Sequence, residues 1–311
     1  MNILGKNKKI ILLIILLIVV VGVVYFVYYY DNKQNILPDE SNNITNNSPE
    51  DYFEHVSLEA KSAFVWDAKE GRVLFSLNEE AQLPLASLTK MMTALVVYNL
   101  VPSKTIITIN ESDIEIEGDS GLSVGEKWTL SNALDFILLT SSNDGAHALA
   151  SVIGFIKQDK EKTAKELFIE EMNKKAQEIG LTQTYFLNES GLDFNEKISG
   201  AYGSTKDMAF LMDNIIKNNA RIIEATRYSN LIINSKKVEH LAENTNYYAE
   251  SIPGIIGSKT GFTDLAGGNL VVAFDVGIGH PVIVSVLGSS REGRFTDVNK
   301  LVEATINKFK K

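Results

Sequence analysis

The sequence predicts an α+β fold in which both ends of the chain form one antiparallel β-sheet, with a helical lobe inserted between them and one transmembrane helix in front. Three observations predict it: hairpin patterns at residues 62–78 and 267–290, helical periodicity between them, and an uncharged apolar run near the N-terminus. The chain has 311 residues, 45% of them hydrophobic, which is ample for a packed core.

The apolar run covers residues 10–30, IILLIILLIVVVGVVYFVYYY, without a single charge. At 1.5 Å per residue such a helix spans roughly 31 Å, about one hydrocarbon core. A cleaved signal peptide has a shorter apolar stretch and a small-residue cleavage site, and a buried core helix is the remaining alternative. Because lysines and no acid precede the run, the positive-inside rule keeps residues 1–9 in the cytoplasm. We therefore expect a single-pass protein of the cell membrane, anchored through residues 10–30, with the rest of the chain outside the cytoplasm.

Residues 31–56 separate this anchor from the rest of the chain. They are rich in asparagine, contain Pro38 and Pro49, and offer little to bury, so they cannot offset the entropy lost on ordering. We expect a flexible tether there, followed by one globular domain over residues 57–311.

Within this domain the elements follow in chain order. The first hairpin turns at Lys69-Glu70-Gly71. Helical periodicity predicts helices over about 87–100, 129–154, 162–180 and 203–217. Gly180 ends the third helix, and Ser204 begins the fourth, three residues before Asp207, as in a capping box. The second hairpin occupies residues 267–290, and a helix from about Thr296 closes the chain.

Composition excludes several classes of function. There is no cysteine, so disulfides and thiolate metal sites are excluded. The four histidines have no metal-ligand spacing, and no Gly-x-Ser-x-Gly is present, so we expect no metal, no cofactor and no Ser-His-Asp triad of the nucleophile-elbow type. They are His55, His147, His240 and His280. The formal net charge of −9 argues against nucleic acid as a partner, since phosphate binding needs a basic surface.

Ser87 and Lys90 lie three residues apart in the otherwise apolar run LPLASLTKMM. On a helix they share one face, one turn apart. A serine hydroxyl needs a base within hydrogen-bond reach, and a desolvated lysine can serve because burial lowers its pKa. A serine in the first turn also directs helix N–H groups at developing negative charge. The alternative is an ordinary N-cap serine and a surface lysine, since about one Ser-x-x-Lys is expected by chance in such a chain.

Two further motifs carry chemistry-bearing residues. Ser141-x-Asn143 supplies a hydroxyl and an amide that could relay a proton and hold a substrate backbone, although a polar interruption between two helices is the alternative. Lys259-Thr260-Gly261 supplies a cation, a hydroxyl and a glycine that permits close backbone approach, which suits a carboxylate. An ordinary charged loop is the alternative there.

The three motifs in this order are the set found in penicillin-binding proteins and serine β-lactamases. From about residue 58 to the end, the chain resembles the low-molecular-mass D-alanyl-D-alanine carboxypeptidases of the serine DD-peptidase/β-lactamase-like superfamily. The resemblance lies in the segments ASLTKMMTA, SSNDGA, FLNESGL, STKDMA and KTGFTDLAGGNLV.

The resemblance implies a serine hydrolase that removes the terminal D-alanine from peptidoglycan stem peptides and that β-lactams acylate. It implies Ser87 as the nucleophile, Lys90 as its base and Ser141 as the group that passes a proton to the leaving D-alanine. By the same resemblance, Asn143 holds the peptide amide and Lys259 completes the charge network. The remaining roles it implies are Thr260 and Arg294 on the substrate carboxylate beside Gly261, and backbone N–H groups of Ser87 and Phe262 as the oxyanion hole.

Two alternatives and two departures remain. The chain could be a serine β-lactamase, but Ser142 stands where class A enzymes usually have aspartate, and no deacylating glutamate loop is evident. It could also be a non-catalytic tethered module that binds peptide or penicillin. Ala201 and Gly203 replace the histidine and one hydroxyl usual in such relatives, and NESGL replaces their Asn-Pro pairing. We expect both departures to lie away from the three motifs and to affect only substrate detail.

Overall fold

The computed structural model describes residues 20–21, 52–102, 104–114, 118, 121–156 and 161–310. The anchor predicted at residues 10–30 lies outside them, except for Val20 and Val21, and so does most of the predicted tether. No helix in these described stretches is long and apolar enough to cross a membrane. The anchor and the tether therefore stay predictions.

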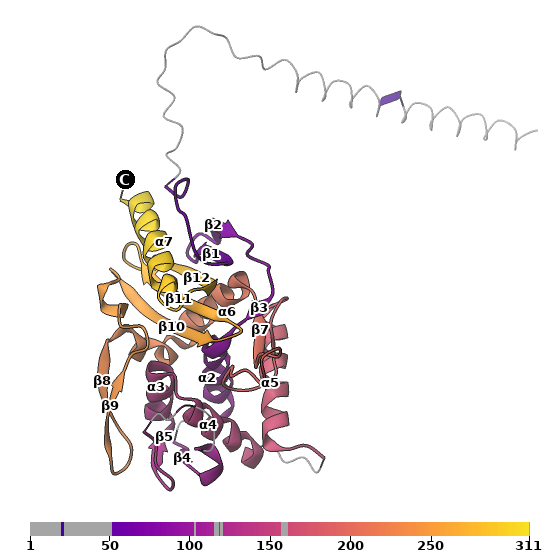
Figure 1. Cartoon of the computed structure of the whole chain (residues 1–311), viewed down its shortest axis with the longest axis vertical. Coiled ribbons are helices and arrows are strands. Elements are labelled where there is room, and N and C mark those ends of the chain that lie inside the picture. The colour runs from indigo at the N-terminus through magenta and orange to yellow at the C-terminus, as the bar shows by residue number, and fades with distance from the viewer. Residues whose placement is uncertain are drawn as a thin grey trace, which may run out of the picture. The chain divides into compact units, whose positions relative to one another are not determined.

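The central element is a five-stranded antiparallel sheet with the strand order β10-β11-β12-β1-β2 (Figure 1). Its strands are β1 (Ser62–Asp67), β2 (Arg72–Leu77), β10 (Ile255–Thr263), β11 (Gly267–Asp275) and β12 (Pro281–Ser289). Strands β1 and β12 pair from Ser62 opposite Leu287 to Asp67 opposite Val282. Both chain ends thus build one sheet, which confirms the predicted α+β class and both hairpins.

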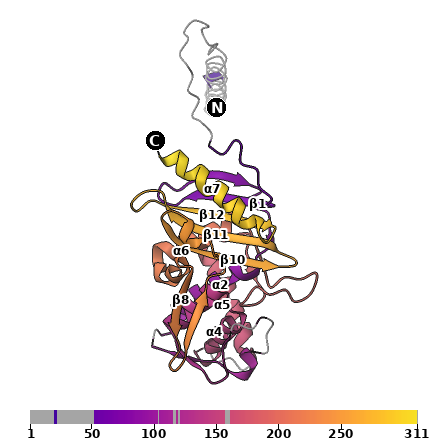
Figure 2. The ribbon, with the colours of Figure 1, turned by 60° about the vertical axis from the view of Figure 1, so that its left-hand side comes forward.

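Helices cover both faces of the sheet, because side chains of a strand alternate between its faces. Ala63 and Val65 belong to the core beneath α7 (Gly293–Phe309), which lies across the strands in Figure 2. Phe64, between them, meets Phe210 of α6 (Thr205–Asn219) edge to face at 6.2 Å. The terminal helix therefore exists, but it begins at Gly293 rather than near Thr296.

The folded domain begins before its predicted start at residue 57. Phe53 is buried, and its ring stacks on that of Phe75 in β2 at 5.5 Å between centroids. Residues 52–56 thus belong to the packed unit.

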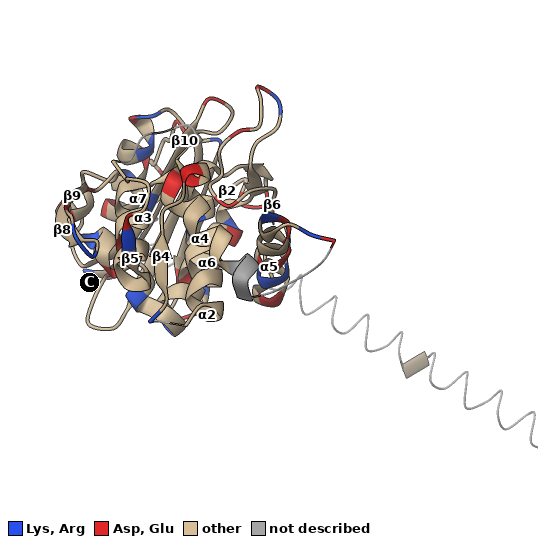
Figure 3. Cartoon of the chain, turned by 90° about the horizontal axis from the view of Figure 1, so that it is seen from below, with Lys and Arg blue, Asp and Glu red and all other residues tan. Residues whose placement is uncertain are grey.

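The inserted lobe is helical. It contains a 3₁₀ turn η1 (Ala86–Leu88) and the helices α2 (Thr89–Leu100), α3 (Leu130–Thr140), α4 (Asn143–Ile156) and α5 (Ala164–Ile179). Helix α2 is buried from Thr89 to Val97 and contacts α3, α4, α5 and α6. Figure 3 shows both signs of charge along α5, whereas α2 and α4 are almost free of charged residues. An apolar helix at the centre of the lobe can hold a polar side chain away from water.

One predicted helix is two. The pattern over residues 129–154 is interrupted at Ser141, whose φ of 62° is left-handed and ends α3, and α4 begins at Asn143. Gly180 ends α5 with φ 83°, as predicted.

Three small sheets and four 3₁₀ turns carry no sequence signal, because strands of two to five residues contain too few alternations. The sheets are β4 (Ile106–Thr108) with β5 (Lys127–Thr129), β8 (Asn230–Asn234) with β9 (Glu239–Glu243), and β7 (Ala201–Gly203) between β3 (Leu83–Pro84) and β6 (Tyr185–Phe186). The turns are η2 (Glu111–Asp113), η3 (Ala220–Ile222), η4 (Glu224–Arg227) and η5 (Ala249–Ser251).

Candidate active site

Ser87 lies on η1, directly before α2, and its side chain is partly accessible. The preceding Ala86 has a φ of 48°, an unfavourable left-handed conformation for a residue with a Cβ. Asn269 of β11 ties this turn to the sheet, since its amide donates to the carbonyls of Pro84 at 3.0 Å and Leu85 at 3.1 Å. The sheet thereby helps to hold the strained turn that presents Ser87.

Lys90 is fully buried one helical turn after Ser87. Its Nζ donates to Ser87 Oγ at 2.9 Å, to Asn143 Oδ1 at 2.7 Å and to the carbonyl of Ser190 at 2.9 Å. Burial lowers the pKa of Lys90 to about 7, although the charges of Glu189 and Asp144 oppose that shift. Near neutral pH a fraction of Lys90 is therefore an uncharged amine in contact with the serine hydroxyl, which is what a general base requires.

Ser141 approaches the same place from the break between α3 and α4. Its Oγ accepts a 2.9 Å hydrogen bond from Nζ of Lys259, which also donates to the carbonyl of Thr260. Burial lowers the pKa of Lys259 well below its usual value, and the positive charges of Lys90 and Arg294 lower it further. The neighbouring Ser142 has a structural part, since its hydroxyl accepts from the backbone N–H of Gly145 at 2.9 Å.

Strand β10 borders the site on the side of the sheet. A Cβ at Gly261 would lie 2.9 Å from the carbonyl of Leu85 and 3.2 Å from the backbone nitrogen of Ser87, so glycine lets the strand approach the serine turn. The hydroxyl of Thr260 lies 2.6 Å from that of Thr245. Sequence reasoning did not identify Thr245, which lies in a loop without a recognisable motif.

Arg294 enters from the first turn of α7. Its Nη1 donates to the carbonyl of Gly261 at 2.8 Å, and its Nε has no hydrogen-bond partner among the described residues. The next residue of β10, Phe262, lies under the guanidinium of Arg291 at 4.1 Å. Together the buried basic side chains of the site are Lys90, Lys259 and Arg294. Such a cluster in an acidic protein favours an anionic ligand group.

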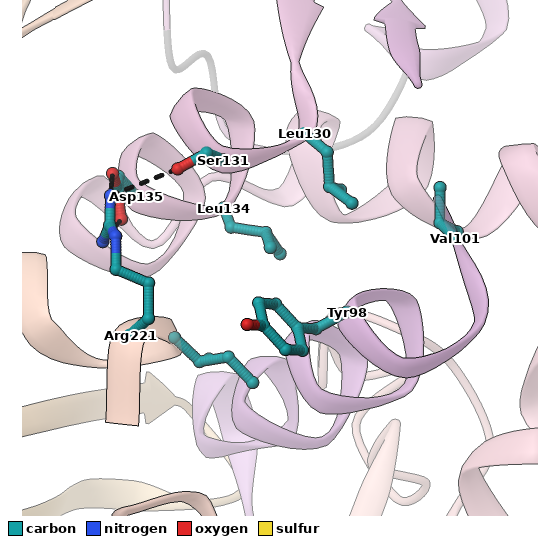
Figure 4. A pocket seen from close by; sticks show the side chains of 8 residues that line it. Tyr98, Val101, Leu130, Ser131, Leu134, Asp135 and Arg221 are labelled. Carbon is teal, nitrogen blue, oxygen red and sulfur yellow. Dashed lines mark hydrogen bonds and ion pairs between the residues drawn. The ribbon is translucent and has the colours of Figure 1, made fainter. Parts of the chain in front are cut away.

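A separate pocket of about 240 Å³ lies at the opposite end of α2 (Figure 4). It is lined by Tyr98, Val101, Leu130, Ser131, Leu134, Asp135, Arg221 and Ile222. Arg221 donates to both carboxylate oxygens of Asp135, at 2.8 and 2.6 Å, and to Ser131. Because its charged groups are paired with one another and no motif residue lines it, we place the chemistry at Ser87.

Histidine–carboxylate contacts occur singly. The pairs are His147 with Glu189, His240 with Glu126, and His280 with Asp67. Across the described stretches, no three such side chains gather where they could hold a metal ion.

The comparisons with known proteins identify the family of the chain. The family profile described as D-alanyl-D-alanine carboxypeptidase matches residues 45–291. The chain belongs to the D-alanyl-D-alanine carboxypeptidase family. Membership of this family is consistent with the three motifs around Ser87.

Relatives of this D-alanyl-D-alanine carboxypeptidase family member include two kinds of peptidase. D-alanyl-D-alanine carboxypeptidase DacF of Bacillus subtilis is 28% identical over 81% of this chain, and the match covers 63% of DacF. A D-alanyl-D-alanine endopeptidase of Pseudomonas aeruginosa is 28% identical over 78% of this chain and 76% of its own length. Penicillin-binding protein D2 of Listeria monocytogenes, solved in an ampicillin-bound form, is 28% identical with a TM-score of 0.67, covering 80% of this chain and 97% of that one.

The segment NESGL was expected to lie away from the three motifs, and this prediction is wrong. Lys90 donates a hydrogen bond to the carbonyl of Ser190 in this segment. The next residue, Gly191, has a φ of 83°, and a Cβ there would lie 1.8 Å from the carbonyl oxygen of Ala86. The segment is thus in direct contact with the serine turn and with its base. A single sequence carries no signal for this contact, because a loop has no periodicity that predicts its neighbours.

The stretch AYGSTKD likewise lies beside the first motif. Its strand β7 pairs with β3, and the carbonyl of Ala201 accepts from the backbone N–H of Leu85 at 3.0 Å, two residues before Ser87. A Cβ at Gly203 would lie 2.5 Å from the hydroxyl of Thr184. The second departure therefore also supports the serine turn.

Proposed function

We propose that this protein is a membrane-anchored serine D-Ala-D-Ala carboxypeptidase that removes the terminal D-alanine from peptidoglycan stem peptides through an acyl-enzyme on Ser87. The observation that carries the proposal is the 2.9 Å contact between Nζ of the buried Lys90 and Oγ of Ser87. Membership of the carboxypeptidase family supports it.

In the proposed acylation, Lys90 takes the proton of Ser87 as Oγ bonds to the carbonyl carbon of the penultimate D-alanine. The oxyanion that forms accepts hydrogen bonds from the backbone N–H groups of Ser87 and Phe262. Ser141, held by Lys259, passes its proton to the nitrogen of the departing D-alanine and receives in its place the proton that Lys90 took from Ser87. Water then releases the shortened peptide and restores Ser87.

Substrate binding in this proposal uses the residues of the site that can hold a carboxylate and a peptide amide. The terminal carboxylate of the peptide binds at Thr260 with Arg294, next to the backbone of Gly261. Asn143, already in contact with Lys90, holds the peptide amide of the substrate. A β-lactam, whose carboxylate occupies the same place, acylates Ser87; the ampicillin-bound form of the Listeria monocytogenes relative supports this part.

The proposed localisation is the outer side of the cell membrane, with residues 10–30 as the single span. It rests on the uncharged run and the lysines before it. Deletion of residues 1–31 is expected to move the protein from the membrane to the soluble fraction of a cell lysate. Retention of this truncated protein in the membrane fraction after carbonate washing would contradict the predicted anchor.

The test of function uses the full chain in detergent, mixed with a fluorescent penicillin and followed by intact mass, with Ser87→Ala as control. A stable adduct that the variant lacks, together with D-alanine release from a stem pentapeptide, is the expected result. Adduct that forms and disappears within seconds would indicate a serine β-lactamase instead. No adduct would favour a non-catalytic tethered module.

Endopeptidase action is the second candidate, favoured by the Pseudomonas aeruginosa relative. Both reactions cleave after a D-residue and need the same acyl-enzyme. Incubation with cross-linked muropeptide dimers, in parallel with the pentapeptide, separates them by the product released.

A further inference from the structure

Glu189 is a buried carboxylate that the proposed reaction does not use. Its side chain is 2% exposed, its Oε1 lies 2.8 Å from Nδ1 of His147 on α4, and its Oε2 lies 3.6 Å from Nζ of Lys165 on α5. Burial by itself raises the pKa of Glu189, but the hydrogen bond with His147 and the charge of Lys165 outweigh burial, so the pKa lies below its ordinary value. The carboxyl group is therefore an anion at neutral pH.

Helix α2 fixes the position of this anion relative to the base. Lys90 donates to the carbonyl of Ser190 at 2.9 Å, and Thr93, three residues after Lys90, donates to the carbonyl of Glu189 at 2.6 Å. Two successive carbonyls of the loop are thus held by the face of α2 that carries the base.

Helix α4 makes the same connection from the other side. Asn143 accepts a hydrogen bond from Lys90, and His147, four residues later on the same face, contacts the carboxylate of Glu189. Helix α4 thus contacts both the lysine and the glutamate, and α2 carries both the lysine and the hydroxyl that holds the carbonyl of Glu189.

The charged and titratable groups near Lys90 come from three elements. Glu189 from the loop contributes the largest favourable charge, and Asp144 from the first turn of α4 contributes the second. Lys259 from β10 is a further titratable neighbour, whose pKa is lowered by burial and by the charge of Lys90. Around Glu189 itself, His147 and Lys165 supply the facing groups.

We propose that Glu189, held as an anion by His147 and Lys165, is a positioning residue that stabilises the protonated Lys90 formed when Ser87 attacks. The proton moves from Ser87 Oγ to Lys90 Nζ as Oγ bonds to the carbonyl carbon, and Glu189 exchanges no proton. This inference rests on the proposed function and deepens it, since it assigns a part of the acylation machinery that lies outside the three motifs.

The test is the pH profile of acylation by a fluorescent penicillin, measured from pH 5 to 9 on the full chain in detergent. Glu189→Gln keeps the shape of the side chain but removes its charge, so Lys90 loses its proton at a lower pH. We expect the acidic limb of the profile to move down by about one pH unit. The plateau rate is expected to fall, because the lysine becomes a weaker base.

Two further variants serve as a test in the opposite direction and as a control. Lys165→Met removes a positive charge from Glu189, so the acidic limb is expected to move upward, and by less because Lys165 is half-exposed. Glu170→Gln removes an exposed carboxylate from the same helix, where its partner is Lys162, and is expected to leave the limb unchanged.

The outcomes separate charge from packing. An unmoved limb in Glu189→Gln, with the rate lowered equally at every pH, overturns the proposal, because Glu189 then only supports the fold. If Glu189→Gln shows no cooperative thermal unfolding, Lys165→Met decides, and a limb that stays or moves down overturns the proposal. Failure of the proposed function is recognised separately, because wild-type protein would then form no adduct at any pH.

Discussion

Lys259 of β10 donates a 2.9 Å hydrogen bond to Ser141, the left-handed residue that separates α3 from α4. The bond joins the sheet to the helical lobe beside Ser87. Lys90 makes the matching contact from within the lobe, so two buried lysines approach two serine hydroxyls. Acylation and proton return to a leaving group can thus be served by different side chains.

The hydroxyl of Ser141 is tested by two replacements that differ in backbone preference. Ser141→Gly accepts the φ of 62° without strain, whereas Ser141→Ala does not. Both are expected to slow acylation by a fluorescent penicillin roughly 10²-fold or more, since both lack the proton relay. Because the wild-type serine already bears a Cβ at this φ, only the glycine variant relieves backbone strain, and it should be more stable than the alanine variant by about 1 kcal/mol in urea unfolding. Normal acylation by the glycine variant would show that the hydroxyl is dispensable.

The role of Lys90 as the base is tested by the pH dependence of the acylation rate. Because burial lowers the pKa of Lys90 to about 7, the amine is uncharged above that pH and protonated below it. The acylation rate is therefore expected to rise through pH 7 and to level off above it in stopped-flow measurements. Lys90→Met should reduce the rate roughly 10²-fold or more. A flat wild-type profile between pH 5 and 9 would argue that another group accepts the serine proton.

Gly191 and Gly71 form a matched pair for the loop beneath the serine turn. Both have a left-handed φ, of 83° and 65°, but a Cβ at Gly191 would collide with the carbonyl of Ala86, whereas one at Gly71 meets nothing within 4 Å. Gly71→Ala is expected to cost about 1 kcal/mol, the conformational penalty alone. Gly191→Ala should cost about 3 kcal/mol or more and abolish acylation. Equal melting temperatures for the two variants would contradict the contact.

Asn269 is predicted to be a structural support of the nucleophile. Its amide serves the carbonyls of Pro84 and Leu85, and its Oδ1 accepts from the backbone N–H of Gly288 at 2.9 Å. Asn269→Asp keeps the oxygen that accepts from Gly288. It replaces the amide nitrogen that donates to the carbonyls of Pro84 and Leu85 by a carboxylate oxygen. We expect a loss of about 2–4 kcal/mol in urea unfolding and slower acylation. A stability within about 0.5 kcal/mol of wild type, the range that is usual for surface substitutions, would exclude this role.

Patterns of short range predicted much of the fold. Alternation around Lys69-Glu70-Gly71 and over residues 267–290 indicated two hairpins, and both are present. Their meeting in one sheet was predicted from the order of the elements, with two early strands, a helical middle, and late strands followed by a terminal helix. A break at Ser141 was considered only as an alternative to one continuous helical stretch, since the apolar pattern continues across it and a left-handed residue leaves no mark in periodicity.

The candidate site, like the fold, was predicted only in part. The spacing of Ser87 and Lys90 placed both on one helical face, and the structure brings them to 2.9 Å. The contacts of Glu189 and of Asn269 were missed, because each joins residues far apart in the chain through side chains that resemble ordinary polar positions.

The sequence by itself determined both hairpins and the main helices and singled out the three motifs as the candidate site, because local spacing decides which residues share a face. Only the tertiary structure decided that Lys259 reaches Ser141, that the NESGL segment touches Lys90, and that burial leaves this lysine able to lose its proton near pH 7. These properties depend on which elements pack together and how much water they exclude, and neither quantity is contained in a local pattern.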